Sequence, residues 1–413
     1  MHIYDIAVIG GGPAGAMASI RAGQRGEKTI LLEKNPVIGK KLLLTGKGRC
    51  NITNNAHTDD FVRAFGTRGP FYRPAFFSFS NRDLMDFFTQ GGLTLKSERQ
   101  GRVFPVTDRS ADIITVLKKY LKESKVTVIF NTRVQDISRK ESLFQLYLSN
   151  SNIIHCHKVI ISTGGASYGK TGSTGDGYRL AKKLGHTIGT LQPGLVPLKT
   201  HEKWPQKLQG LALKNIRITF KSGSKKIVSS IGELMFTHFG VSGPLVLDLS
   251  ARILSLLGKN HEVKLFIDLK PGLQKEQLTN RLIRDFRSAG PAGIKKIMKN
   301  LLPAKLAGIF PDLAGLPPEQ KANQITRQQR HKIIDMVKAL PLTVTGSLRL
   351  ESAMITCGGV SAKEINPRSM ESRITPGLYF AGEIIDGCAP SGGYNLQQAF
   401  STGWLAGNQA SYA

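Results

Sequence analysis

The N-terminal segment that ends at Glu33 constrains the fold more than any other part of the chain. An apolar run, Ile6 to Ile9, leads into the sequence Gly10-Gly11-Gly12-Pro13-Ala14-Gly15, and a second apolar run, Thr29 to Leu32, ends at Glu33. This order predicts a strand, a tight turn, a helix and a second, parallel strand. Such a βαβ unit is typical of dinucleotide-binding sites.

Each glycine of this turn has a steric role. Gly10 allows the tight turn, Gly12 lets the backbone approach a pyrophosphate, and Gly15 lets the helix pack closely on the strand. The free N–H groups at the start of the helix attract the anion. Glu33 follows directly after the second apolar run, where a carboxylate accepts hydrogen bonds from ribose hydroxyls. We therefore predict a bound dinucleotide at this end of the chain.

The charge of the chain indicates a polyanionic partner. The 413 residues, enough for two or three domains, include 57 Lys and Arg against 29 Asp and Glu, a net charge of +28. Residues 199–226 carry a net charge of +7 and residues 270–338 carry +9. Such a concentrated surplus of positive charge favours binding to a polyanion. The alternative interpretation is a lysine-rich surface that only contacts solvent.

The apolar and terminal sequences argue for a cytoplasmic protein. No uninterrupted apolar run approaches the length that a membrane-spanning helix needs, so we expect no membrane span and no membrane partner. The first strand begins near residue 3, which leaves no room for a targeting peptide before it.

The cysteines predict neither a disulfide framework nor a metal site. Cys50, Cys156, Cys357 and Cys388 are scattered and include no CxxC pair. His155-Cys156-His157 resembles a ligand cluster, but alternate residues of a strand face opposite sides of the sheet. We therefore expect reduced thiols and no metal.

Alternating strand and helix signals predict an α/β fold with a doubly wound sheet. The apolar runs 6–9 and 159–161 suit parallel strands that are covered on both faces. Residues 211–231 alternate in polarity around a Ser-Gly-Ser turn and predict an antiparallel hairpin, whereas residues 271–340 have helical periodicity. The terminal strand and helix, 377–383 and 396–406, would return to the first site, because ligands lie at the carboxyl ends of strands.

Four segments of the chain resemble the BaiN/YhiN-type FAD-dependent oxidoreductases, also described as aminoacetone oxidase-like FAD-binding enzymes. The segments are Gly39–Asn54, His238–Pro244, Met370–Ser372 and Gly377–Gln397. The resemblance covers nearly the whole chain and implies a Rossmann-like FAD-binding domain built from both chain ends. The implied domains are 1–192 with 345–413, an inserted β-barrel-like domain at 193–270 with a closing strand at 341–350, and a basic helical domain at 271–340.

The resemblance also implies a role for each cofactor-binding segment. Glycines in the first loop let the backbone run under a flavin ring, and Gly382 and Glu383 approach the pyrophosphate and ribityl chain. The helix that follows Gly393 directs its positive end to the flavin N1/O2 edge, where the reduced flavin accumulates negative charge. The cofactor-binding residues predicted in this way are Gly10, Gly12, Pro13, Ala14, Gly15, Glu33, Lys34, Lys41, Gly46, Gly48, Arg49, Cys50, Asn51, Thr163, Gly164, Gly382, Glu383, Gly393, Tyr394, Asn395 and Leu396.

The segment Ile385–Ser391 departs from the family pattern, so the proton donor is open. The Cys388 thiol is one candidate acid, although a small residue that fills a turn explains it equally well. Tyr394 and Asp386 are further candidates. Arg49 would clamp either a flavin phosphate or an anionic substrate.

Three substrate classes follow from the resemblance: a conjugated enone such as an oxidised bile acid, a small amine such as aminoacetone, and a uridine of large-subunit ribosomal RNA. No second GxGxxG motif is present, so NAD(P)H would dock only transiently. The charge favours ribosomal RNA, since each phosphate contact releases counterions. The leading hypothesis is reduction of uridine to dihydrouridine. A small-molecule flavin reductase or oxidase and a non-catalytic RNA-binding flavoprotein are the alternatives.

Overall fold

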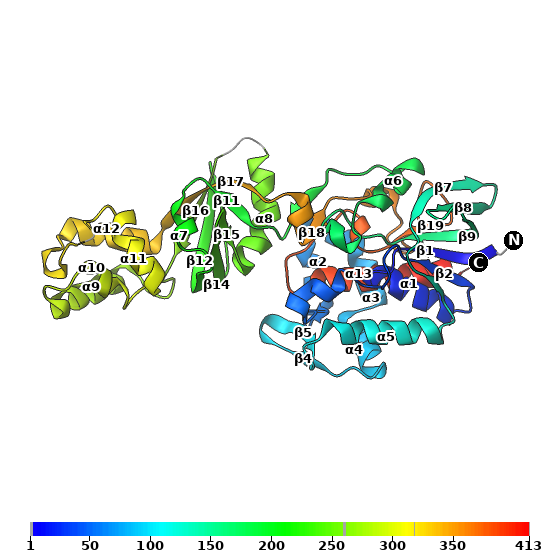
Figure 1. The fold of residues 1–413 in the computed structure, drawn as a ribbon, viewed down its shortest axis with the longest axis horizontal. Helices are drawn as coiled ribbons and strands as arrows, with labels where there is room; N and C mark the ends of the chain where they lie inside the picture. The colour runs from blue at the N-terminus through cyan, green and yellow to red at the C-terminus, as the bar shows by residue number, and fades with distance from the viewer. Residues whose placement is uncertain (1–2, 259–261, 318, 413) are drawn as a thin grey trace. The chain divides into compact units, whose positions relative to one another are not determined.

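The chain folds into two compact units. The computed structural model describes residues 3–258, 262–317 and 319–412. Unit 1 comprises Met1–Gly194 with Arg349–Ala413, and unit 2 comprises Leu195–Leu348 (Figure 1). Both chain ends therefore belong to unit 1, as predicted for the FAD-binding domain.

A mixed sheet forms the centre of unit 1. Its strand order is β6-β2-β1-β9-β8-β7, and β19 also pairs with β9. The pairs β2–β6, β1–β2, β1–β9 and β9–β19 are parallel, whereas β7, β8 and β9 pair antiparallel. The strands are β1 (Ile3–Ile9), β2 (Thr29–Leu32), β6 (Thr127–Ile129), β7 (Val134–Lys140), β8 (Leu143–Leu148), β9 (Ile153–Ile161) and β19 (Leu378–Phe380). The predicted α/β sheet is confirmed.

Two helices from opposite ends of the chain pack directly against each other. These are α1 (Pro13–Gln24) and α13 (Tyr394–Ala410), drawn in blue and red in Figure 1. A Cβ atom on Gly403 would lie 2.2 Å from the carbonyl oxygen of Ala14, and one on Gly407 would lie 2.3 Å from that of Ala18. Only glycine allows this close approach. The C-terminal helix is thereby held beside the first βαβ unit.

The remaining elements of unit 1 surround this centre. A small antiparallel sheet has the order β3-β5-β4. The elements are β3 (Thr53–Asn54), α2 (Thr58–Ala64), α3 (Gly69–Ser78), α4 (Asn81–Gln90), β4 (Leu95–Ser97), β5 (Arg102–Pro105), α5 (Ser110–Glu123), α6 (Asp176–Lys183), β10 (Gln192–Gly194) and β18 (Ile355–Cys357).

Unit 2 contains a closed β-barrel. Its strand order is β13-β12-β14-β15-β11-β17-β16, and an additional pairing of β12 with β16 closes the circuit. The strands are β11 (Leu198–Thr200), β12 (Ala212–Ser222), β13 (Lys225–Val228), β14 (Gly232–Thr237), β15 (Gly240–Ser242), β16 (Val263–Asp268) and β17 (Leu340–Ser347). The barrel inferred from the sequence is present, and β17 supplies its predicted closing strand.

The helical segment of unit 2 does not form a separate compact unit. Leu278, Phe310 and Ile334 of the helices belong to the same buried core as Phe220 and Leu265 of the barrel. One apolar core therefore crosses the boundary drawn from the sequence at residues 270 and 271, and both segments belong to one compact unit. The helices of the unit are α7 (Trp204–Lys207), α8 (Pro244–Leu257), α9 (Lys275–Ala289), α10 (Ile294–Met298), α11 (Ala304–Leu313) and α12 (Arg327–Lys338).

Within the described ranges of both units, no helix is long and apolar enough to cross a membrane.

A buried Ser–His–Glu arrangement links distant segments of unit 1. The His186 side chain is fully buried, with Nε2 2.8 Å from Ser372 Oγ and Nδ1 3.1 Å from Glu364 Oε2. Ser372 Oγ also accepts the backbone N–H groups of Ile374 and Thr375. The hydroxyl therefore donates to Nε2, and the proton on Nδ1 is donated to Glu364. With its hydroxyl and imidazole enclosed, this arrangement is structural.

The imidazole makes the stability of the protein pH-dependent. Burial lowers the pKa of His186 below its usual 6.5, and hydrogen bonds from Thr187 and His186 lower the pKa of Glu364. As the pH falls below about 6.5, His186 becomes protonated in the unfolded chain but stays neutral in the folded protein. The free energy of unfolding therefore decreases. Glu364 adds a loss of the same sign below about pH 4.5. Guanidinium unfolding at pH 8 and pH 5.5 should show this loss, and His186→Gln should reduce it; an equal loss in both proteins would contradict the assignment.

Candidate flavin site

The first turn of unit 1 forms a cradle with one open position. Gly10 has φ +103°, and a Cβ atom there would lie 2.8 Å from the carbonyl oxygen of Ser162. A Cβ on Gly15 would lie only 1.9 Å from the carbonyl oxygen of Gly10. By contrast, a Cβ on Gly12 would meet no heavy atom within 4 Å. No side chain caps α1, so its first N–H groups are directed to this open position.

Glu33 is fixed beside this cradle. The residue is 7% exposed, and its carboxylate accepts hydrogen bonds from Gly11 N at 2.6 Å, Asn35 N at 2.7 Å and Asn35 Nδ2 at 2.7 Å. Because two carboxylate oxygens accept about four hydrogen bonds, capacity remains for a ligand hydroxyl.

A second uncapped helix start lies in the same unit. Gly393, at φ +98°, precedes α13, and no side chain caps this helix. A Cβ on Gly393 would lie 2.3 Å from the backbone of Thr53. Thr53 Oγ1 donates to Gln397 Oε1 at 2.6 Å, and Gln397 Nε2 donates to the carbonyl oxygen of Phe79 at 3.2 Å. These contacts hold the helix start in place, and the positive end of its dipole favours an electron-rich ligand edge.

An ion pair joins four segments near the carboxyl ends of the strands. Lys41 Nζ lies 2.8 Å from Glu383 Oε2 and also donates to Ser167 Oγ at 2.8 Å. Glu383 Oε1 accepts the backbone N–H of Thr356 at 2.7 Å. Lys41 and Glu383, both predicted as cofactor-binding residues, are thus brought together by a contact that spans most of the chain.

Two buried polar atoms of this region have no hydrogen-bond partner among the residues that the structure describes. They are Thr163 Oγ1, which follows β9 beside Gly10, and the Tyr178 hydroxyl in α6. Burial, reinforced by Glu383 and Asp386, raises the pKa of Tyr178, so its phenol stays protonated. Buried polar groups in folded proteins are nearly always hydrogen-bonded. The two atoms are therefore available to hydrogen-bond a polar ligand, and Tyr178 is a residue that the sequence did not single out.

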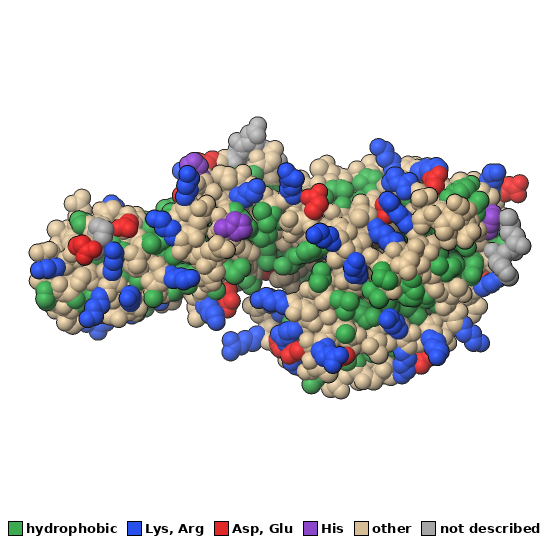
Figure 2. Space-filling model, in the orientation of Figure 1, with side chains coloured by type: hydrophobic (Ala, Val, Ile, Leu, Met, Phe, Trp, Pro, Cys, Tyr) green, Lys and Arg blue, Asp and Glu red, His purple; other side chains and the backbone are tan. Residues whose placement is uncertain are grey.

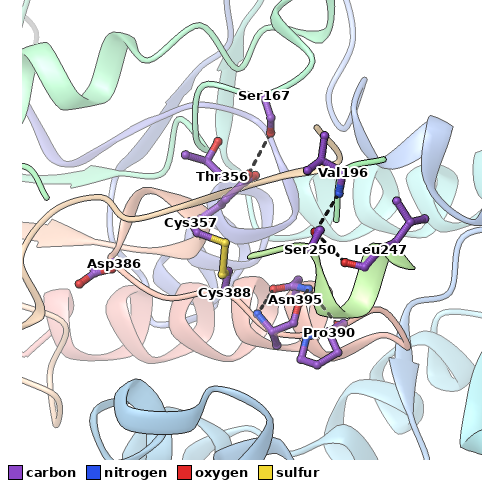
Figure 3. Close-up of a disulfide and its surroundings, with 12 residues drawn as sticks. Ser167, Val196, Leu247, Ser250, Thr356, Cys357, Asp386, Cys388, Pro390 and Asn395 are labelled. Atoms are coloured by element: carbon purple, nitrogen blue, oxygen red, sulfur yellow. Dashed lines mark hydrogen bonds between the residues drawn. A yellow bond between two sulfur atoms is a disulfide. The ribbon is translucent and has the colours of Figure 1, made fainter. Parts of the chain in front are cut away.

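The structure corrects the prediction for Cys388. Its sulfur lies 2.11 Å from that of Cys357, in a disulfide that was not expected from the spacing of the cysteines (Figure 3). A disulfide sulfur carries no proton, so Cys388 is not an acid in this form. The two cysteines are 31 positions apart, and no local pattern marks them as a pair.

The other catalytic candidates have protein partners. The Asp386 carboxylate forms an ion pair with Arg68. The ring of Tyr394 makes an edge contact with Phe61, at 5.1 Å between centroids. Asn395 closes the preceding loop, since Ala389 N donates to its Oδ1 at 2.9 Å.

Two predicted cations are held by protein carboxylates. Arg49 Nε donates to Asp108 at 2.8 Å, and its guanidinium also pairs with Glu98 and lies over the ring of Phe104. Lys34 pairs with Asp176 at 2.8 Å. Arg49 is therefore not positioned as the free phosphate clamp that the sequence suggested.

The residues that follow Arg49 are fixed by the surrounding protein, although the loop before it is exposed at Leu44 and Lys47. Cys50 is fully buried, and burial raises the pKa of its thiol to about 12. Asn51 Oδ1 accepts the backbone N–H of Val103 at 3.1 Å, and Gly46 turns the chain at φ +57°. These residues shape the loop, and their contacts with a cofactor stay a prediction.

Comparison with known proteins identifies the family. The model of the HI0933-like protein Rossmann domain matches residues 4–409. The chain belongs to this family. It is 30% identical over 407 residues to a 3-dehydro-bile acid delta(4,6)-reductase of Clostridium scindens, covering 98% of both chains. It is 31% identical over 411 residues to a ribosomal RNA dihydrouridine synthase of Escherichia coli, covering 98% of this chain and 97% of the relative.

Solved structures share the fold of this HI0933-like protein. A 3-ketosteroid delta1-dehydrogenase from Sterolibacterium denitrificans superposes with a TM-score of 0.54 at 14% identity, covering 100% of both chains. A flavocytochrome c3 fumarate reductase gives a TM-score of 0.53 at 16% identity, covering 99% of this chain and 78% of that one. At these identities the likeness concerns the fold alone.

The family and the site together identify the cofactor as FAD, and the protein as a flavin-dependent oxidoreductase. The uncapped starts of α1 and α13, the open position at Gly12 and the orphaned atoms of Thr163 and Tyr178 fit a large polar ligand with an anionic middle. The turn at Gly12 would hold the pyrophosphate, Glu33 the ribose, and the α13 start the flavin.

Proposed function

We propose that this flavoenzyme reduces a C=C bond conjugated to a carbonyl, and that its substrate is a uridine of large-subunit ribosomal RNA, which becomes dihydrouridine. NAD(P)H would be the transient electron donor. The observation that carries the choice of RNA is the charge of unit 2. This unit contains 25 Lys and Arg and only 10 Asp and Glu, a net charge of +15 in 154 residues.

The acidic residues of unit 2 are too few to neutralise this charge. Lys264, Lys275 and Arg281 pair with carboxylates of the same unit, as does Lys338. On the face shown in Figure 2, Lys and Arg side chains are spread over the unit. An RNA would gain affinity from many phosphate contacts, each of which releases counterions. A small substrate needs only one or two basic side chains to neutralise its charge.

The residues of unit 1 supply what the reaction needs besides the cofactor. FAD, once reduced, supplies a hydride. The start of α13 would stabilise the negative charge of the reduced ring. After the hydride has added to the carbon β to the carbonyl, the neighbouring carbon needs a proton, and the Tyr394 hydroxyl is the proposed donor. A base in structured RNA must also leave its stack to reach the flavin.

One of the relatives supports a second candidate. The Clostridium scindens relative is named as a bile-acid reductase, and a ring enone accepts hydride by the same chemistry as uridine. A small-molecule reductase would reoxidise its flavin with enones or amines and would bind RNA no better than an inert basic protein does. Tight RNA binding without turnover would instead identify a non-catalytic flavoprotein.

The direct test is an inventory of dihydrouridine in ribosomal RNA by mass spectrometry. In cells that lack the gene, we expect one position of the large-subunit RNA to revert to uridine. The native gene should restore the modification. Retention of every ribosomal dihydrouridine in the deletion strain would overturn the proposal.

A further inference from the structure

The Cys357–Cys388 disulfide connects two segments that carry residues of the candidate flavin site. Cys357 ends β18, directly after Thr356, whose backbone N–H donates to Glu383. Cys388 adjoins Ala389, which Asn395 in the first turn of α13 binds through two hydrogen bonds of 2.9 Å (Figure 3). Each cysteine is thus the sequence neighbour of a residue, Thr356 or Ala389, that is hydrogen-bonded to a residue of the candidate flavin site.

Both segments are held in place without the disulfide. Cys357 itself pairs with Gln192 in the β10–β18 ladder. On the other segment, Ile384, Ile385 and Ala389 are buried in the core of unit 1. Disulfides are needed for stability mainly in small domains that cannot build a sufficient core. The core of unit 1 is extensive, so stability alone does not account for this cross-link.

The four cysteines of the chain fall into two classes. Cys357 and Cys388 are both partly exposed, whereas Cys50 and Cys156 are fully buried. Burial also raises the pKa of both free thiols to about 12. Reactivity in thiol–disulfide chemistry requires access and thiolate character. Only the Cys357–Cys388 pair satisfies the first requirement.

We propose that Cys357 and Cys388 form a redox-active pair that receives two electrons from the reduced flavin of the same chain. The S–S bond breaks, and the two sulfurs take up two electrons and two protons to become thiols. The reduced flavin, which the α13 start holds as an anion, gives up these two electrons and one proton and returns to its oxidised form, and the second proton comes from the solvent. The inference rests on FAD as the cofactor and is independent of the RNA substrate.

Electron counting and thiol labelling test this inference on the holoprotein. During anaerobic titration with dithionite, the native protein should take up about four electrons per chain, two for the flavin and two for the disulfide, before the flavin stays bleached. The Cys357→Ser/Cys388→Ser double variant should take up about two. Iodoacetamide should label the peptides of Cys357 and Cys388 in the native holoprotein after the titration and not before it, as read by mass spectrometry.

The controls separate flavin-mediated transfer from direct reduction. Cys156→Ser, which removes a buried free thiol, should titrate like the native protein. Protein stripped of FAD should stay unlabelled at Cys357 and Cys388 under the same dithionite. An uptake of about two electrons by the native protein, or equal labelling with and without FAD, would overturn the inference. Neither readout involves RNA, so the proposed function fails or stands separately.

Discussion

A Gly12→Ala protein should fold and lose its FAD. Gly12 has φ −74°, a conformation that alanine adopts freely, and its Cβ would meet no protein atom within 4 Å. The fold therefore loses only about 0.5 kcal/mol, from replacing glycine at the start of a helix. The same methyl group would occupy the place assigned to the pyrophosphate. We expect FAD affinity to fall by at least about 100-fold, or about 2.7 kcal/mol.

The comparison with other glycines makes this experiment specific. Gly15→Ala would place a Cβ 1.9 Å from the carbonyl oxygen of Gly10, so it would damage the fold itself. The matched control is Gly308→Ala in α11, where a Cβ also meets nothing within 4 Å. Alanine in a helix interior should add about 0.5 to 1 kcal/mol of stability and leave the flavin content unchanged. Native flavin content in Gly12→Ala would refute the assignment of the pyrophosphate.

Neutralising lysines of unit 2 should weaken RNA binding and its dependence on salt. The proposed set, all exposed, is Lys199, Lys203, Lys207, Lys214, Lys225 and Lys226, each replaced by Gln. Each lost phosphate contact lowers the slope of log K against log salt by about 0.7 to 0.9. If most of the six contact phosphates, the slope should fall by about 3 to 5 and the affinity roughly 100-fold or more.

Filter binding or fluorescence anisotropy with a large-subunit RNA fragment, measured over a salt series, gives both quantities. The control replaces the same number of exposed lysines in unit 1: Lys118, Lys119, Lys122, Lys125, Lys140 and Lys182. This set removes the same net charge and should change the affinity far less. Equal losses for the two sets would show that binding follows total charge and would remove the support that unit 2 lends to RNA as substrate.

Much of the fold was predictable because its signals are local. The antiparallel hairpin expected within residues 211–231 is formed by β12 and β13, and residues 271–340, expected to be helical, contain the helices α9 to α12. Their periodic apolar residues face a single core, which is the condition under which periodicity predicts a helix. The boundary drawn at residue 270 follows a change of secondary structure, whereas the compact unit of the structure is defined by an apolar core that the barrel and the helices share.

The candidate site was predictable only in part. The glycine turn and Glu33 belong to one short βαβ segment, so their spacing alone predicts a cradle. The contacts of Arg49 and Cys388 were not predictable, because their partners come from other parts of the chain. Arg49 forms ion pairs with Glu98 and Asp108, and Cys388 forms a disulfide with Cys357. The orphaned hydroxyl of Tyr178 likewise depends on how α6 packs.

The sequence by itself therefore determined two features of this protein. The βαβ unit at the start of the chain follows from glycine positions and strand periodicity, which are properties of neighbouring residues, and the excess of positive charge follows from a simple count. Only the tertiary structure decided that α13 packs on α1, that Lys41 meets Glu383, and that two of four cysteines form a disulfide. These contacts join parts of the chain that are far apart in the sequence, and a single sequence contains no local pattern that records such pairings.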